Sequence, residues 1–214
     1  MQLQFDPIGF PLVRLDGLGL SVSLLPITKV QFERFIAQPN SLGDAWYEKI
    51  LGINPRLSWR RPDSALRERL FVTGVLPSEA LAYASWAGIG FDLPSVKEWR
   101  MVLRSLTEAR LASTSLRDLR GDKVHPAARA IVESILDQVQ PRTWAELALL
   151  RGGVIEWVRE DEGFKGLGIP RQQFLPAVFN PAQDPPLLPL HNERSRYFGF
   201  RVIRRPFRRV GGKS

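Results

Sequence analysis

Few residue types in this chain are able to carry out chemistry. The 214 residues include no cysteine and only two histidines, His125 and His191. The absence of cysteine excludes disulfides, thiolate metal sites and a cysteine nucleophile. The two histidines lie far apart in sequence with no further ligands at metal-binding spacing, so we expect surface or capping groups rather than a metal site.

Three other patterns also fall short of a catalytic site. The acidic run 160–162 (EDE) offers oxygen ligands for Ca²⁺, but a solvated loop is the simpler interpretation. Ser195 lies between two arginines near His191, yet sequence proximity supplies neither the base nor the orienting group that a nucleophile needs. Gly166 and Gly168 lack the strand-to-helix context and the third glycine of a dinucleotide site.

The charge balance favours an acidic partner. The formal net charge is +8, which suits contact with an acidic protein, nucleic acid or an anionic surface. Residues 59–61 (WRR) join an aromatic ring to two cations, as single-strand binders do, although a tryptophan that anchors a loop is the simpler interpretation. Basic residues also gather near the end of the sequence, where a solvated tail that aids solubility is the simpler interpretation. They are Arg201, Arg204, Arg205, Arg208, Arg209 and Lys213.

Composition predicts a soluble globular protein in the cytoplasm. The length suits one domain, and the chain is 44% hydrophobic and 24% charged. No apolar run approaches the roughly 18 residues that span a membrane. Residues 1–6 lack the basic and apolar regions of a signal peptide. We therefore expect no membrane contact.

Hydrophobic periodicity predicts the elements that position these residues. Residues 9–25 are expected to form two short strands with a tight turn at Asp16-Gly17. Thr28 is expected to cap a helix, Gly88 to end one, and Ser95 with Glu98 to form a capping box. Helices are predicted over residues 26–37, 77–88, 94–106, 108–119 and 126–139. Core strands are predicted over residues 154–158 and 198–203, with an irregular loop over roughly 163–190 between them.

Five sequence blocks, in order, resemble those of the formylglycine-generating enzyme (sulfatase-modifying factor) family. Each block alone is weak, and the five together across residues 26–202 make the resemblance specific. They are 26–35 (PITKVQFERF), 72–75 with 79–86 (VTGV and EALAYASW), 93–99 (LPSVKEW), 152–158 (GGVIEWV) and 199–202 (GFRV).

The resemblance implies an α+β fold related to C-type lectins. Such a fold has little regular secondary structure, a small twisted mixed sheet and packed helices. The large rigid side chains of six tryptophans and twelve phenylalanines suit long loops that need anchoring. We expect the motif residues to be structural, with Glu98 accepting from nearby backbone donors and Arg201 pairing with a buried carboxylate such as Glu156.

The chain departs from the family where the family's chemistry lies. The resemblance implies a copper-binding cysteine pair near the C-terminus, but residues 190–197 (LHNERSRY) contain no thiol. A motif asparagine that binds calcium in many relatives is Gly153 here, which makes a calcium site doubtful. The strand expected after residues 152–158 is not recognisable, and two predicted helices over 107–148 replace a glycine- and aromatic-rich loop.

These observations predict a non-catalytic protein without a cofactor. We expect one domain over residues 1–214, with a helical insertion at about 107–148 and a basic tail over 204–214. Its expected function is that of a binding module that docks an acidic protein partner in a bacterial multi-component system. Loops 38–70 and 160–197 would form the binding face, and the helical insertion is a second candidate surface. Arginine and aromatic side chains dominate binding hot spots, so the expected contacts are Arg60, Arg61, Phe164, Arg171, Phe174, Phe179, Arg194, Arg196 and Tyr197.

Two alternatives come from other functional classes. The first is an accessory protein that binds nucleic acid through the basic tail and residues 59–61; its affinity would fall steeply with salt. The second is a divergent metal-dependent oxidoreductase, because related sulfoxide synthases bind iron through three histidines.

Overall fold

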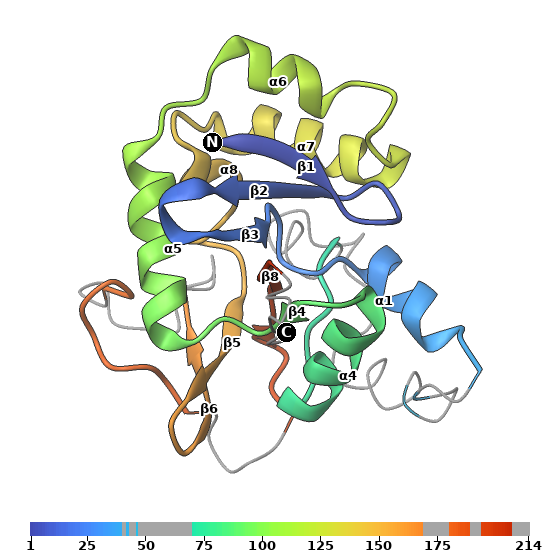
Figure 1. Cartoon of the computed structure of the whole chain (residues 1–214), viewed down its shortest axis with the longest axis vertical. Helices are drawn as coiled ribbons and strands as arrows, with labels where there is room; N and C mark the ends of the chain where they lie inside the picture. Colours follow the sequence, from blue (N-terminus) through green and yellow to red (C-terminus); the bar gives the residue numbers. More distant parts are fainter. Residues whose placement is uncertain (40–41, 43–45, 47–69, 169–179, 189–193, 207–214) are drawn as a thin grey trace, which may run out of the picture.

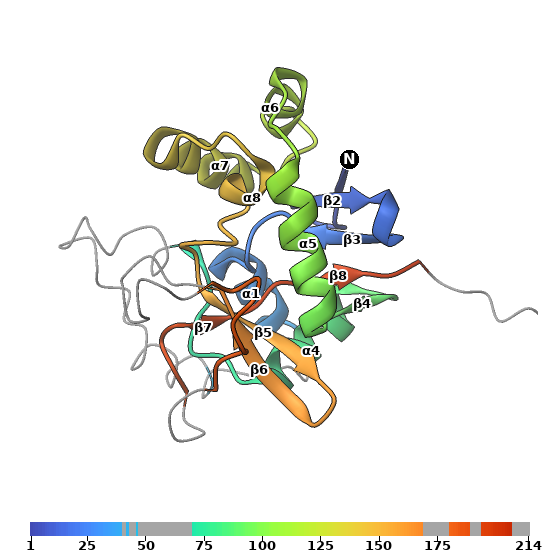
Figure 2. The ribbon, with the colours of Figure 1, turned by 90° about the vertical axis from the view of Figure 1, so that its left-hand side faces the viewer.

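The structure, a computed structural model, describes residues 1–39, 42, 46, 70–168, 180–188 and 194–206. These residues form an α+β fold with two β-sheets, which confirms the predicted class. Helices α6 (Ser113–Leu119) and α7 (Pro126–Val139) lie at one end of the molecule. The hairpin of β5 (Ile155–Glu160) and β6 (Gly163–Leu167) lies at the other (Figure 1, Figure 2).

The larger sheet is antiparallel and has the strand order β1-β2-β3-β8-β4. Residues 9–25 contain the predicted strand pair, β2 and β3, joined by a single 3-10 turn, η1 (Asp16–Leu18), in place of a two-residue turn. Strand β8 comes from late in the chain and lies between two strands that are formed much earlier. The strands are β1 (Gln2–Phe5), β2 (Pro11–Leu15), β3 (Leu20–Ser23), β8 (Ile203–Arg204) and β4 (Phe91–Asp92).

The smaller sheet is mixed, with the order β6-β5-β7. Strand β5 pairs antiparallel with β6 and parallel with β7 (Phe198–Gly199). The expectation of an irregular loop from residue 163, with no strand after β5, is therefore wrong. Strand β6 forms through backbone pairing with β5, and position 166 requires glycine because a Cβ there would collide with the ring of Phe198.

The single strand predicted over residues 198–203 is two short strands in different sheets. Between β7 and β8 the chain crosses from one sheet to the other, and its backbone pairs with other segments. The carbonyl of Phe200 accepts from the N–H of Ile27 at 2.8 Å, and that of Val202 accepts from Ser23 at 2.9 Å. Hydrophobic periodicity cannot detect this crossing, because all the residues from 198 to 203 are buried.

Capping residues set the helix boundaries as predicted. Thr28 and Gln31 form a capping box at α1 (Lys29–Ile36), and Ser95 and Glu98 form one at α5 (Val96–Glu108). The Glu98 carboxylate accepts from the N–H of Ser95 at 2.8 Å, as expected. Helix α4 (Pro77–Ala87) ends at Gly88, whose φ of 128° suits glycine.

The helical region 107–148 packs on the body of the protein. Helix α7 buries Ile131, Val132 and Ile135 in the same cluster as α5 and the larger sheet, and Ala128 in a smaller cluster with Phe10 and Val124. Helix α5 extends to Glu108, and α6 begins later than predicted, at Ser113. A short helix that the sequence did not indicate, α8 (Trp144–Leu147), contacts both α5 and α7.

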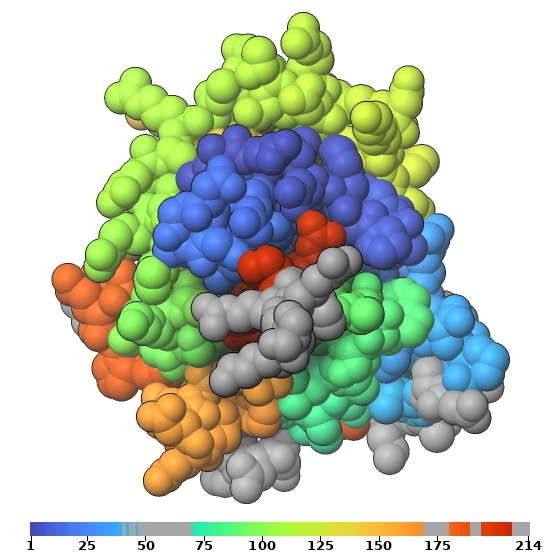
Figure 3. All heavy atoms as spheres, viewed as in Figure 1, coloured from blue at the N-terminus to red at the C-terminus, as the bar shows by residue number. Residues whose placement is uncertain are grey.

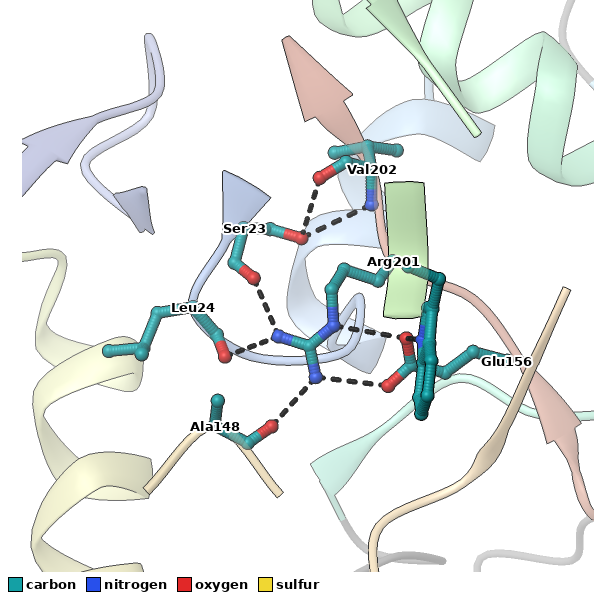
Figure 4. A network of polar contacts seen from close by, with 7 residues as sticks. Ser23, Leu24, Ala148, Glu156, Arg201 and Val202 are labelled. Atoms are coloured by element: carbon teal, nitrogen blue, oxygen red, sulfur yellow. Dashed lines mark hydrogen bonds and ion pairs between the residues drawn. The ribbon is translucent and has the colours of Figure 1, made fainter. Parts of the chain in front are cut away.

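A buried ion pair between Glu156 and Arg201 lies where the sheets and helices meet (Figure 4). Both side chains are 0% exposed, and Arg201 donates to the two Glu156 oxygens at 3.0 Å each. The other guanidinium hydrogens go to backbone carbonyls: Ser23 at 2.6 Å, Ala148 at 2.7 Å, and Leu24. All five N–H donors of the guanidinium are therefore satisfied.

Three of the motif blocks converge on this pair. The indole N–H of Trp99 donates to Glu156 Oε2 at 2.8 Å, so block 93–99 meets blocks 152–158 and 199–202. Ser23 adds a second link, because its hydroxyl contacts both the N–H and the carbonyl of Val202 at 3.2 Å (Figure 4). The expected pairing of Arg201 with Glu156 is confirmed, and these residues are structural.

A second charged cluster fixes the end of β8. Arg205 donates to Glu98 at 3.0 and 2.8 Å and to Asp92 at 2.9 Å. Burial raises the pKa of Glu98, but the hydrogen bonds from Arg205 and Ser95 and the charge of Arg205 together outweigh it and hold that pKa below its usual range. Arg204 donates to Gln4 at 2.7 Å. The first two residues of the predicted basic tail are thus part of the fold, and residues 207–214 lie outside the described residues.

His125 joins α7 to the rest of the protein. Its Nδ1 accepts from the N–H of Ala127 at 3.2 Å and so caps α7, while Nε2 lies 3.0 Å from Arg34 on α1. The ring also stacks on Phe10 at 5.1 Å. Burial lowers the pKa of His125 and the charge of Arg34 lowers it further, against an opposing effect of Asp6.

We expect Arg201→Met to lower the free energy of unfolding by about 3–5 kcal/mol, because it leaves the Glu156 charge buried without a partner. The matched control is Arg14→Met, which removes the exposed Arg14–Asp16 pair and should cost no more than about 1 kcal/mol. Urea denaturation followed by tryptophan fluorescence measures both values. Equal losses in the two variants would contradict the central role of the buried pair.

We also expect stability to fall as the pH drops below about 6.5, the ordinary pKa of histidine. The folded pKa of His125 is lowered, so the unfolded chain binds more protons in that range and the free energy of unfolding decreases there. His125→Asn keeps an N-cap and removes the titrating group. Urea melts at pH 5.5–7.5 should show a weaker pH dependence for this variant, and identical slopes would refute the assignment.

Candidate functional site

Four of the nine contact residues predicted from sequence lie in the part of the chain that the structure describes. Phe164 is on β6, and Arg194, Arg196 and Tyr197 precede β7. The other five lie outside the described residues: Arg60, Arg61, Arg171, Phe174 and Phe179. Trp59 and His191 also lie outside them.

Two of the predicted aromatic contacts pack against one core cluster. Phe164 and Tyr197 are both half-buried against the cluster that contains Trp157 and Phe198. Within that cluster the Trp157 and Phe198 rings lie 4.5 Å apart, and the indole N–H of Trp157 donates to the carbonyl of Val75 at 2.8 Å. Phe164 and Tyr197 thus pack on buried aromatic residues whose positions are fixed.

Arg196 is the most accessible of the predicted contacts that the structure describes. Its side chain is exposed, its Nε lies 2.7 Å from the Tyr197 hydroxyl, and its guanidinium carbon lies 4.9 Å from the centre of that ring. An arginine held against an aromatic ring keeps its charge in the solvent with less conformational freedom. This pair suits recognition of a carboxylate.

Arg194, another of the predicted contacts, is bonded within the protein and is mostly buried. It donates to the carbonyl of Gly74 at 3.0 Å and forms a two-pronged ion pair with Glu79 on α4, with an NH1–Oε2 distance of 2.7 Å. The two side chains are only 18% and 8% exposed. Burial raises the pKa of Glu79, but the hydrogen bonds and charge of Arg194, together with the other hydrogen bonds that Glu79 accepts, outweigh it and hold that pKa below its usual range. Arg194 anchors the segment that presents Arg196.

The other sequence candidates do not form a catalytic arrangement in the described residues. The Ser195 hydroxyl contacts the N–H of Tyr197 at 3.4 Å. In the acidic run 160–162, Glu160 pairs with Lys165, while Asp161 and Glu162 are exposed at the turn between β5 and β6. Across the described ranges there is no group of three or more histidine, aspartate and glutamate side chains that could hold a metal ion.

The metals that the resemblance implies do not fit this chain. Copper needs the thiols of the family, and the sequence has none. For calcium, a side chain at position 153 would place its Cβ 2.6 Å from the carbonyl oxygen of Leu149, so the backbone accepts only glycine there. Both oxygens of Glu156 are already bonded to Arg201 and Trp99. The motif positions are therefore occupied by internal contacts.

Sequence reasoning missed one surface feature, an open groove between α5 and the turn that joins β5 to β6. Its α5 wall carries Lys97, Arg100, Met101 and Arg104, and we call this feature the α5 groove. The signal was present in the sequence, because residues 97, 101 and 104 have the i, i+4, i+7 spacing of one helix face inside a predicted helix.

None of the described helices has the length and hydropathy of a membrane-spanning segment. No curated protein matches the chain significantly in sequence. The family model of the sulfatase-modifying factor enzyme 1-like domain matches residues 11–163, which is more than half of the chain and includes four of the five motif blocks. The chain therefore belongs to the sulfatase-modifying factor enzyme 1-like domain family.

Proposed function

We propose that this protein is a non-catalytic binding module built on the scaffold of its family. One observation carries the proposal: the polar residues that the chain keeps from the family motifs, Trp99, Glu156 and Arg201, bond to one another in the core. The sequence also lacks any cysteine for the chemistry that the resemblance implies. The motif residues that the chain shares with the family therefore stabilise the fold. A rigid fold that displays loops is suited to recognition.

The binding face in this proposal consists of loops 38–70 and 160–197. Among the described residues, Phe164, Arg196 and Tyr197 are its contacts, and Arg194 is a positioning residue. The Arg194–Glu79 pair ties the segment before β7 to α4, so that Arg196 and Tyr197 project from a fixed base. Preorganised aromatic and arginine side chains lose little entropy on binding.

The proposed ligand is a protein with an acidic surface, in a bacterial multi-component system in the cytoplasm. The net charge of +8 and the exposed Arg196 support this chemistry. Within the proposal the chain is one domain over residues 1–214. Nucleic-acid binding is less well supported by the described residues, because Arg204 and Arg205 are bonded to Gln4, Glu98 and Asp92.

Arg196→Ala should weaken capture of the partner at least fivefold with no change in melting temperature, because the side chain is exposed. Arg194→Ala is the contrasting variant. It removes charged hydrogen bonds worth about 2 kcal/mol, so it should lower the melting temperature by about 4–8 °C. The immobilised chain is exposed to extract of the source cells, and retained proteins are quantified by mass spectrometry.

A set of retained proteins that is the same for wild type and Arg196→Ala would contradict the proposed face. Retention of nucleic acid alone, lost at raised salt, would favour the nucleic-acid alternative. The non-catalytic assignment is tested separately by oxygen uptake in the presence of thiol substrates and either copper or iron. Metal-dependent uptake above the rate without protein would overturn it.

A further inference from the structure

The exposed face of α5 carries a regular row of side chains. Lys97, Met101 and Arg104 are all exposed and follow one another at i, i+4 and i+7, so they form one stripe along the helix. The opposite face of α5 buries Trp99, Val102, Leu103 and Leu106 in the core. Because the helix is fixed by its buried face, the stripe has a rigid geometry.

The two cations of the stripe have no carboxylate partner among the described residues. Most charged neighbours are already paired: Arg159 with Asp92 at 2.6 Å, and Glu98 with Arg205. Arg100, the third cation of this wall, donates to the carbonyls of Pro181 and Asp184 and joins α5 to segment 180–184. Lys97 and Arg104 therefore present uncompensated positive charge.

The other wall of the α5 groove carries Arg159, Glu160 and Asp161, at the end of β5 and the turn to β6. Arg159 is paired with Asp92 and Glu160 with Lys165, so Asp161 is the charge of this wall that has no ion-pair partner among the described residues. In Figure 3, α5, this turn and segment 180–188 lie side by side at the lower left. Most of the lining residues are charged or polar, but the exposed lining surface is mainly apolar, because the stems of lysine and arginine contribute to it beside Val96 and Met101. The groove suits a charged polypeptide segment.

Apolar side chains are exposed along the same surface. Met101 is 37% exposed in the α5 groove, and Leu188 is 66% exposed beside Phe164 in a second hollow across the turn. These are two of the four large hydrophobic residues that are exposed in the described part of the chain. Methionine is common at binding surfaces because its flexible side chain adapts its shape to a partner.

We propose that the α5 groove binds an amphipathic helix of a protein partner through two acidic residues one heptad apart. Those carboxylates pair with Lys97 and Arg104, and an apolar residue between them packs on Met101. A basic residue on the flank of the helix faces Asp161. This inference rests on the proposed function and deepens it, because it assigns the acidic partner a second docking surface and a local structure.

The spacing of the stripe selects a helical partner. Seven residues of α-helix rise about 10.5 Å, and a partner helix repeats its face over the same distance. In an extended strand, residues on one face recur at multiples of about 6.6–6.8 Å, which does not match that distance. The carboxylate of Asp161 in the groove also disfavours nucleic acid, since it would repel phosphates. Peptides that bind as helices in grooves use this same i, i+4, i+7 pattern of anchors.

The test uses the full chain and a fluorescein-labelled, alanine-rich 18-residue helical peptide with Glu at i and i+7, Leu at i+4 and a flanking Lys. Fluorescence anisotropy at low salt measures its Kd. We expect saturable binding by the wild type and at least tenfold weaker binding by the double variant Lys97→Glu/Arg104→Glu. A peptide with Lys in place of both Glu residues should regain binding to that variant.

The matched control, Arg117→Glu/Lys123→Glu, reverses two exposed charges near α6 and should bind within twofold of wild type. Circular dichroism checks that all variants are folded. Absent binding by the wild type, equal binding by the α5 double variant, or tighter binding of single-stranded DNA to the same surface would each overturn the proposal. Capture that depends on Arg196 would still stand in those cases, so the failure of the groove and the failure of the proposed function are distinguishable.

Discussion

The buried ion pair between Glu156 and Arg201 is the interaction on which the rest of the structure depends. It connects the carbonyl groups at the end of β3 and just after α8 to β5, and through Trp99 to α5. A buried charge pair is tolerated only when every donor and acceptor is satisfied, because desolvation costs several kcal/mol per ion. The guanidinium meets this condition with five bonds to four residues. That requirement fixes the relative positions of segments that are far apart in sequence.

Helix caps and buried ion pairs could be predicted from the sequence better than strand pairing and the roles of surface residues. Capping boxes at Thr28 and Ser95 and the pairing of Arg201 with Glu156 follow from local chemistry and from motif residues. Strand β6 and the crossing between β7 and β8 were not predictable, because they depend on backbone partners supplied by distant segments. The roles of individual arginines were equally hidden. Arg194 and Arg196 are two residues apart, yet only tertiary contacts make one an anchor and leave the other exposed.

The positive charge of the chain divides into two kinds of cation. Arg201, Arg205 and Arg194 are bonded to carboxylates of the scaffold and contribute to its order. Lys97, Arg104 and Arg196 are exposed and face the solvent on surfaces that rigid elements support. Net charge alone does not separate these classes, although only the second kind can attract a partner at a distance. The position of each charge, more than the net charge, therefore decides which residues are available to a partner.

The position of β8 has a consequence for how the protein is made. Because β8 pairs with both β3 and β4, the larger sheet stays open until residues 203–204 have left the ribosome. Ser23 and Val202, which bond to each other, are separated by 179 residues, so the closing contacts have a high sequence separation and form late. Until then the facing edges of β3 and β4 lack a partner strand and are exposed to pairing with other chains. Strand β8 thus completes the sheet and also covers two strand edges that would otherwise be open to pairing.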